Sequence, residues 1–179
     1  MSVRSTIRNF DSHITTWVHT TFSQDFWRNF FGVTTALGDP ITIIVITGCI
    51  MAVGLYYGSM RMLFSGIAIP ITVGAGALIK LLVERARPIS EYSANLGTFS
   101  FPSGHSTGSM VAFGLLAYFA FMKLPGVWGI VVACVLFMVP IVVGVSRVYL
   151  SAHYPSDVLA GWLLGLIGLL IIIFGIRPL

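Results

Sequence analysis

The chain has 179 residues, of which 56% are hydrophobic and only 9% are charged, with a formal net charge of +4, and its mean hydropathy is +0.94. Charged residues make up about a quarter of an ordinary soluble domain, so this composition excludes that class. The sequence therefore predicts an integral membrane protein, and we expect its partner to be the bilayer rather than nucleic acid.

Residues 1–37 form the first segment, and they contain no apolar core followed by a small-residue cleavage site, so they do not resemble a signal peptide. Large apolar residues recur there at helical spacing, with polar residues between them. This pattern is typical of an amphipathic helix lying in the membrane interface, although a helix packed on the rest of the protein would share it. The residues concerned are Ile14, Trp17, Val18, Phe22, Phe26, Trp27, Phe30 and Phe31.

Residues 38–179 follow as one predicted transmembrane domain with five apolar runs. A spanning helix needs roughly 17 to 25 residues, and backbone groups in hydrocarbon must bond within their own segment, so these runs should be helices. The predicted fold is an all-α polytopic bundle. Cys49 and Cys134 lie in mid-span, and we expect buried structural thiols. The five runs are 41–57, 62–83, 106–122, 127–145 and 158–176.

The connections between these runs differ in length. Two are tight turns, GSMR and KLPG, whereas residues 84–102 and 146–157 are longer and rich in polar residues. Since successive spans alternate in direction, the two long connections should lie on the same face as the N-terminal segment. We expect that face to hold the functional site. All six acidic residues fall on it, which suits a cytoplasmic face for the short turns and an extracytoplasmic face for the site, and the small size and minimal loops favour a bacterial plasma membrane.

Ionisable residues near membrane depth are costly and mark candidate functional sites. Lys80 ends the second run, and Arg87 follows two helical turns later, which would place both on one face. Together they suit an anion with several oxygens, because an ammonium and a planar guanidinium converge on it. Two other interpretations are that Lys80 is a snorkelling anchor or that it pairs with Glu84.

The stretch FPSGHSTG, residues 101–108, fits two chemistries. In one, GHSTG is the G-x-S-x-G motif of serine hydrolases, with Ser106 as nucleophile. In the other, Ser103 caps a helix whose free N–H groups bind an anion, and His105 moves a proton. Capping alone would explain Ser103 but not His105, which has no evident partner in the nearby sequence.

The stretch SRVYLSAHYPSD, residues 146–157, carries Arg147, His153 and Asp157. Pro155 fits the first position of the last helix, which puts Asp157 in its first turn. From there the carboxylate can fix the imidazole tautomer of His153 and leave the other nitrogen free as nucleophile or base. A helix-capping Asp beside an interfacial His is the structural alternative.

Taken together, these segments resemble the type 2 phosphatidic acid phosphatase superfamily, whose pattern is K-x6-R-P, then P-S-G-H, then S-R-x5-H-x3-D. All three motifs match in order and without substitution, at residues 80–88, 102–105 and 146–157. One departure is that many bacterial members have six spans, whereas this sequence shows five.

The resemblance implies a lipid phosphatase that needs no metal and no cofactor. His153 would attack phosphorus to give a phosphohistidine, Asp157 would orient it, and His105 would protonate the leaving oxygen and later activate water. The phosphate would be held by Lys80, Arg87, Ser103, Gly104 and Arg147. Family membership allows phosphatidic acid, phosphatidylglycerol phosphate or undecaprenyl pyrophosphate as substrate.

Two other functions compete with this interpretation. A membrane serine hydrolase using Ser106 would leave the three cations without a task. A non-enzymatic protein that binds or transports anionic lipids would use the same cationic pocket without turnover.

Overall fold

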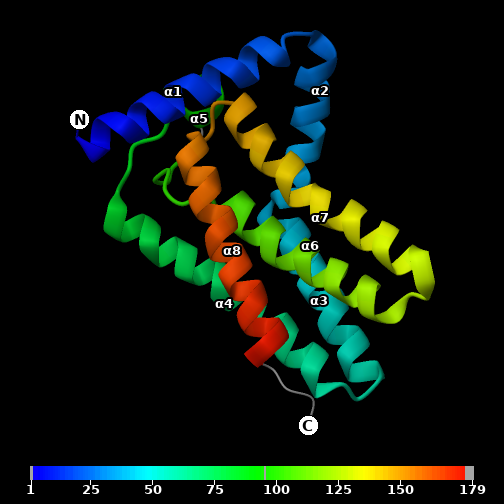
Figure 1. Ribbon diagram of the computed structural model, residues 1–179. Helices are drawn as coiled ribbons and strands as arrows, with labels where there is room; N and C mark the ends of the chain where they lie inside the picture. The colour runs from blue at the N-terminus through cyan, green and yellow to red at the C-terminus, as the bar shows by residue number, and fades with distance from the viewer. Residues whose placement is uncertain (1, 95, 176–179) are drawn as a thin grey trace.

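The computed structural model describes residues 2–94 and 96–175, and over these residues the chain is all helical, with no strand. The predicted all-α fold is therefore confirmed (Figure 1). The elements in chain order are α1 (Val3–Thr21), α2 (Asp25–Thr34), the short 3-10 helix η1 (Thr35–Gly38), α3 (Pro40–Tyr56), α4 (Met60–Val83), α5 (Glu91–Ala94), α6 (Gly104–Lys123), α7 (Gly126–Tyr149) and α8 (Pro155–Gly175).

The N-terminal segment is two helices and a 3-10 turn, where one amphipathic helix was expected. Helix α1 ends at Thr21, and α2 begins at Asp25 after an extended Gln24. The break is held by aromatic packing, since the Phe22 ring lies 4.8 Å from that of Trp27 and 5.2 Å from that of Phe31. Helix α1 crosses one end of the bundle (Figure 1), where Val18 is buried against α7 and α8.

Four helices are long and apolar enough to cross a membrane, namely α4, α6, α7 and α8. The remaining predicted span, 41–57, which is the first in chain order, corresponds to α3, which has 17 residues. It reaches spanning length only together with residues 25–38, and this pair is bent by 46°. The bend falls at Asp39 and Pro40, where the extended Asp39 precedes the proline at the start of α3. Ile176, the expected end of the last span, lies outside the described residues.

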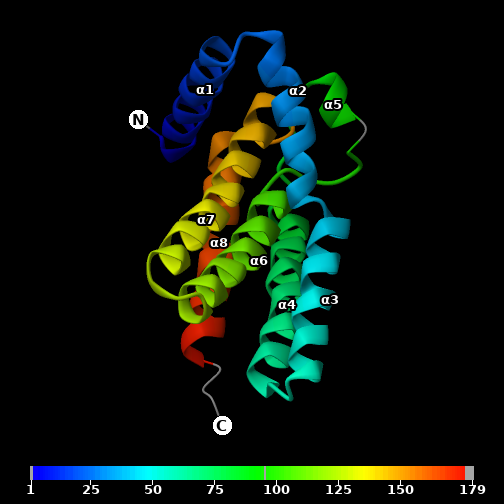
Figure 2. The same cartoon turned by 90° about the vertical axis from the view of Figure 1, so that its right-hand side faces the viewer.

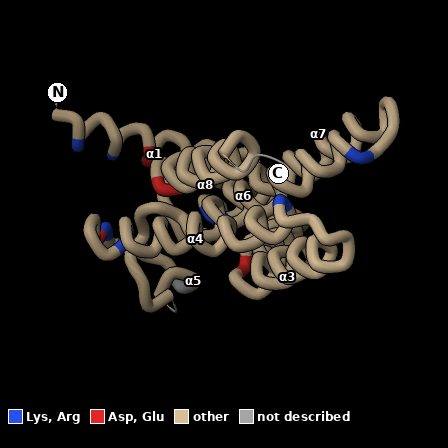
Figure 3. The backbone as a smooth tube through the Cα atoms, turned by 90° about the horizontal axis from the view of Figure 1, so that it is seen from below, with Lys and Arg blue, Asp and Glu red and all other residues tan. Residues whose placement is uncertain are grey.

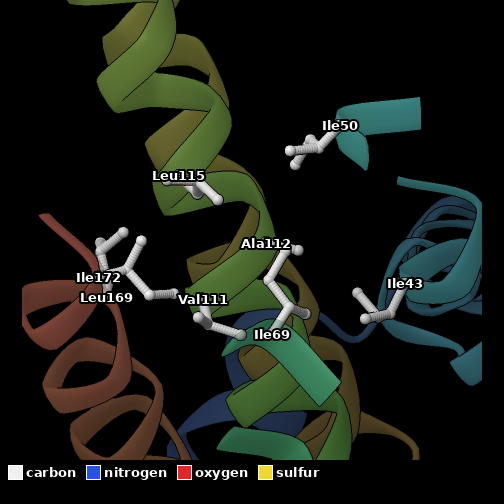
Figure 4. Packing of buried hydrophobic residues seen from close by; sticks show 8 residues of the cluster. All are labelled: Ile43, Ile50, Ile69, Val111, Ala112, Leu115, Leu169 and Ile172. Carbon is white, nitrogen blue, oxygen red and sulfur yellow. The ribbon is translucent and has the colours of Figure 1, made fainter. Parts of the chain in front are cut away.

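Helix α6 is the centre of the bundle, because it is the most deeply buried of the four helices that are long enough to span. One core cluster joins α3, α4, α6 and α8 (Figure 4): it consists of Ile43, Ile50, Ile69, Val111, Ala112, Leu115, Leu169 and Ile172. Helix α8 approaches α6 closely, because a Cβ built on Gly161 would lie 2.6 Å from the Ser103 carbonyl oxygen and one on Gly165 would lie 2.7 Å from that of Thr107. Glycine is thus required at this contact.

Charged side chains are sparse along the bundle (Figure 3). The tight turns α3–α4 and α6–α7 lie away from α1, α2 and α5, which gather at the other end (Figure 2). Cys49 and Cys134 are free and exposed on the outside of their helices. The expectation that they are buried was wrong, because α3 and α7 turn these positions away from the core.

Candidate active site

Three chain segments meet at the end of the bundle beneath α1 (Figure 1). They are the end of α4 with the extended residues after it, the start of α6, and the connection between α7 and α8. These segments carry the three motifs, so motif residues as far apart in the sequence as Lys80 and Asp157 share one location. A hydrogen bond from the Ser103 backbone N–H to the Asp157 carbonyl, 3.0 Å long, joins two of them directly.

Lys80 and Arg87 both reach the site, but they do not lie on one helical face as predicted. Helix α4 ends at Val83, and Glu84 takes a left-handed conformation with φ of 49°. Lys80 Nζ donates to the Phe99 carbonyl at 2.8 Å. Arg87, beyond the helix, donates to the Thr98 carbonyl at 2.7 Å. The turn at Glu84, rather than helical periodicity, therefore brings the two cations to the same loop.

The imidazole of His153 is held in one orientation by groups on both of its nitrogens. Arg87 Nη1 lies 3.1 Å from Nε2, and since a guanidinium can only donate, Nε2 must accept and the ring proton belongs on Nδ1. Nδ1 lies 3.4 Å from Ser100 Oγ and 3.7 Å from Asp157 Oδ2. The second distance is an ionic contact rather than a hydrogen bond. Nε2 is consequently the unprotonated nitrogen of the ring.

His153 is neutral at physiological pH. Burial is the largest cause that lowers its pKa to about 4; Asp157 opposes this, while Arg87, Lys80 and Arg147 add to it. Burial and the charge of Arg147 also lower the pKa of Arg87, against the opposing charge of Asp157. A neutral imidazole beside several cations is suited to attack an electrophile that carries anionic oxygens.

The start of α6 presents its N-terminus to the site. The Ser103 hydroxyl accepts from the Ser106 backbone N–H at 3.4 Å, which is the expected capping position. A Cβ built on Gly104 would meet nothing within 4 Å, so the backbone there is open to a ligand. His105 does have a partner, contrary to expectation: its Nε2 lies 2.7 Å from Asp39 Oδ1.

Arg147 is almost fully buried, at 1% exposure. Its Nη1 donates to Thr35 Oγ1 at 2.8 Å and to the Tyr92 hydroxyl at 3.0 Å. Its Nε has no hydrogen-bond partner among the described residues. Burying an unpaired guanidinium N–H is costly, so this donor indicates an anionic ligand.

Three functional candidates were missed from the sequence: Asp39, Arg85 and Ser100. The hydroxyl of Ser100, fully buried, donates to Asp157 Oδ2 and lies between that carboxylate and His153. Arg85 Nη1 donates to Asp157 Oδ1 at 2.6 Å. Arg85 sits at an unspecified position of K-x6-R-P, and Ser100 and Asp39 lie outside all three motifs, so only the fold brings them to the site.

The structure does not supply a hydrolase site around Ser106. This side chain is fully buried, and its hydroxyl donates to Ser103 Oγ at 3.0 Å rather than to an imidazole. The strand that a G-x-S-x-G elbow requires is absent from the described residues. No three His, Cys, Asp or Glu side chains in that part of the chain gather as ligands for a metal ion.

Comparison with known proteins identifies the class. The model of the PAP2 superfamily matches residues 58–177, so the chain belongs to this superfamily and the resemblance of its motifs is confirmed.

Among its relatives, phosphatidylglycerophosphatase B of Bacillus subtilis is 32% identical over 133 residues, covering 71% of this chain and 63% of the relative. Decaprenylphosphoryl-5-phosphoribose phosphatase of Mycolicibacterium smegmatis is 35% identical over 103 residues, covering 51% of each. The crystal structure of a transmembrane PAP2-type phosphatidylglycerolphosphate phosphatase from Bacillus subtilis matches with a TM-score of 0.76 and 27% identity, over 93% of this chain and 84% of that one. This chain thus spans less than two thirds of the length of these two curated relatives.

Proposed function

We propose that this protein is a membrane lipid phosphatase that works through a phosphohistidine on His153. The observation that carries the proposal is the state of that imidazole: it is neutral, its Nε2 lone pair is directed at Arg87, and its Nδ1 faces Ser100 and Asp157. The three motifs and the names of the relatives, all lipid phosphatases, support the same chemistry.

In the first step, His153 Nε2 attacks phosphorus while the bond from phosphorus to the lipid oxygen breaks. His105 gives its proton to that leaving oxygen, and Asp39 holds the ring. The Nδ1 proton stays on the imidazole, and the positive charge that develops is stabilised by Asp157, directly and through Ser100. The products are a phosphohistidine and a lipid alcohol, or a lipid monophosphate if the substrate is a pyrophosphate.

In the second step, His105 takes a proton from water, and the resulting hydroxide attacks phosphorus and releases His153. Inorganic phosphate leaves. Through both steps the phosphoryl oxygens would be bound by Lys80, Arg87, Arg147 Nε, Ser103 and the Gly104 N–H. Phosphoryl transfer depends chiefly on positioning and on stabilising charge over these oxygens, and three cations with a helix N-terminus provide both without a metal.

The substrate class is a phosphorylated membrane lipid, and the relatives' names favour phosphatidylglycerol phosphate or a polyprenyl phosphate compound. Phosphatidic acid is the third candidate.

A groove of about 910 Å³ between α1 and residues 83–86 includes Ile7, Val83 and Phe101 in its lining. We infer that a lipid tail enters along this groove. Replacing Ile7 by Asn should then raise KM for a long-chain lipid and leave a short soluble phosphate ester unaffected, whereas equal losses on both would contradict this role.

The purified protein in detergent should release phosphate from at least one of the three lipids. His153→Ala should abolish release, and His105→Ala should slow it by roughly 100-fold or more, the usual contribution of general acid–base catalysis. Lipid binding without turnover by the wild-type protein would favour the non-enzymatic alternative. Undiminished release by His153→Ala would exclude the phosphohistidine mechanism.

A further inference from the structure

Arg85 connects the N-terminal helix to the carboxylate beside His153. One nitrogen, Nη1, donates to Asp157 Oδ1 at 2.6 Å, and the other, Nη2, donates to Asp11 Oδ2 at 2.7 Å. The guanidinium also lies over the Tyr154 ring, 4.2 Å from its centroid. Arg85 therefore bridges two carboxylates from opposite ends of the sequence, and neither Asp11 nor Arg85 is a specified residue of the family motifs that identify the site.

Asp11 is a built part of this arrangement rather than a surface charge. It is 3% exposed, although α1 is an outer helix. Its Oδ1 accepts from the Ser156 backbone N–H at 2.8 Å, and its Oδ2 accepts from the Ser156 hydroxyl at 2.9 Å. Burying a carboxylate is costly unless it is paired and hydrogen-bonded, and every one of these partners belongs to the first turn of α8 or to Arg85.

The Asp157 carboxylate is fixed by donors on both oxygens. Arg85 holds Oδ1, while Ser100 and the Tyr154 backbone N–H hold Oδ2. Arg85 by itself would draw the carboxylate away from His153 and neutralise it. Asp11 supplies the compensating charge, so the trio of Asp11, Arg85 and Asp157 retains one net negative charge beside the imidazole.

We propose that Asp11 is a positioning residue for the reaction, which acts through Arg85 to hold the Asp157 carboxylate in place and to leave its negative charge available to His153. This inference rests on the proposed function of His153. It gives α1 a role in catalysis in addition to its role in the lipid groove.

Charged groups on several elements surround His153, and their charges determine whether a substitution raises or lowers its pKa. Lys80 comes from α4, Arg85 and Arg87 from the residues after α4, Arg147 from α7, Asp157 from α8, and Asp11 acts from α1 beyond Arg85. Asp11→Asn removes a negative charge, so it should lower the His153 pKa. Arg85→Gln removes a positive charge, so it should raise that pKa. These shifts measure how far the charge of each residue reaches the imidazole, and the positioning role itself is tested by the kinetics described below.

The test is an NMR titration of the His153 imidazole in detergent, which needs no turnover. Asp11→Asn and Arg85→Gln should move its pKa in opposite directions, each by about half a unit or more. The matched controls Asp25→Asn and Arg28→Gln, on the exposed side of α2, should leave it unchanged. Shifts of the same sign, or no shift, would overturn the proposal whether or not the protein releases phosphate.

Kinetics give the second measurement. On a short soluble phosphate ester, Asp11→Asn should lower kcat about tenfold, the usual effect of a lost hydrogen bond to a charged group, with KM within twofold. Asp11→Asn combined with Arg85→Gln should lose no more than Arg85→Gln alone, because the proposal has Asp11 acting on Asp157 through Arg85, while its bonds to Ser156 anchor α1 to α8. Independent losses that multiply would contradict this.

If Asp11→Asn does not fold, Arg85→Lys, which keeps the charge but cannot bridge both carboxylates, should still lower kcat. Unchanged kcat would overturn the proposal.

Discussion

At the scale of single residues, the site depends on His153 remaining neutral among cations. Its side chain is 2% exposed, and burial, the largest influence, lowers its pKa to about 4. Because a protonated imidazole has no free lone pair, the proposed nucleophile would be lost only as the pH falls through that value. Above it, including the whole physiological range, Nε2 is unprotonated.

We therefore expect the His153 imidazole to titrate near pH 4, where an unperturbed histidine titrates near 6.5. NMR of ring-labelled protein, with His153→Gln to assign the signal, measures this directly. Titration of His153 near 6.5 would mean that the imidazole is not buried as described.

At the scale of elements, the site depends on how closely α8 packs on α6. A Cβ on Gly161 would lie 2.6 Å from the Ser103 carbonyl oxygen and 2.9 Å from Ser106 Cβ. Both contacts lie directly beside the bond from Ser103 N to Asp157 O that joins the two helices. Backbone atoms cannot move aside as a flexible side chain would, so this glycine sets the spacing of two segments of the proposed site.

Gly161→Ala should therefore lower both the thermal midpoint and kcat, with a cost of about 1 to 3 kcal/mol typical of overpacking. Gly74→Ala is the matched control, because a Cβ there meets nothing within 4 Å and the residue lies within α4. Thermal unfolding in detergent and phosphate release on the same preparations make the comparison. Equal behaviour of the two variants would show that the α6–α8 contact is not tight.

The elements also show what sequence could and could not predict. Apolar length predicted α4, α6, α7 and α8, and the motifs predicted that their ends share one location. The break between α1 and α2 was missed because Phe22 continues the helical periodicity while its ring packs on Trp27 and Phe31. Asp11, Asp39 and Ser100 were missed because their partners are remote in sequence, and no local pattern records a contact formed by folding.

At the scale of the whole molecule, the proposed site lies at the end that carries α1, α2 and α5, opposite the tight turns (Figure 2). We propose that this end is extracytoplasmic.

The orientation of the protein in the membrane can be tested by single cysteines in a background without Cys49 and Cys134. Gly97→Cys, in the connection before α6, should react with a membrane-impermeant maleimide in intact bacterial cells, and Lys123→Cys, at the far end of α6, should react only after lysis. The reverse pattern would place the site in the cytoplasm.

The most direct test of the whole account is to trap the intermediate. Phosphatidylglycerol phosphate labelled with ³²P on its terminal phosphate should transfer label to the wild-type protein during turnover. After an alkaline quench, which preserves phosphohistidine, the label should map to the peptide that contains His153, and His153→Ala should acquire none. Label on Ser106, or steady release of phosphate by His153→Ala, would contradict the account.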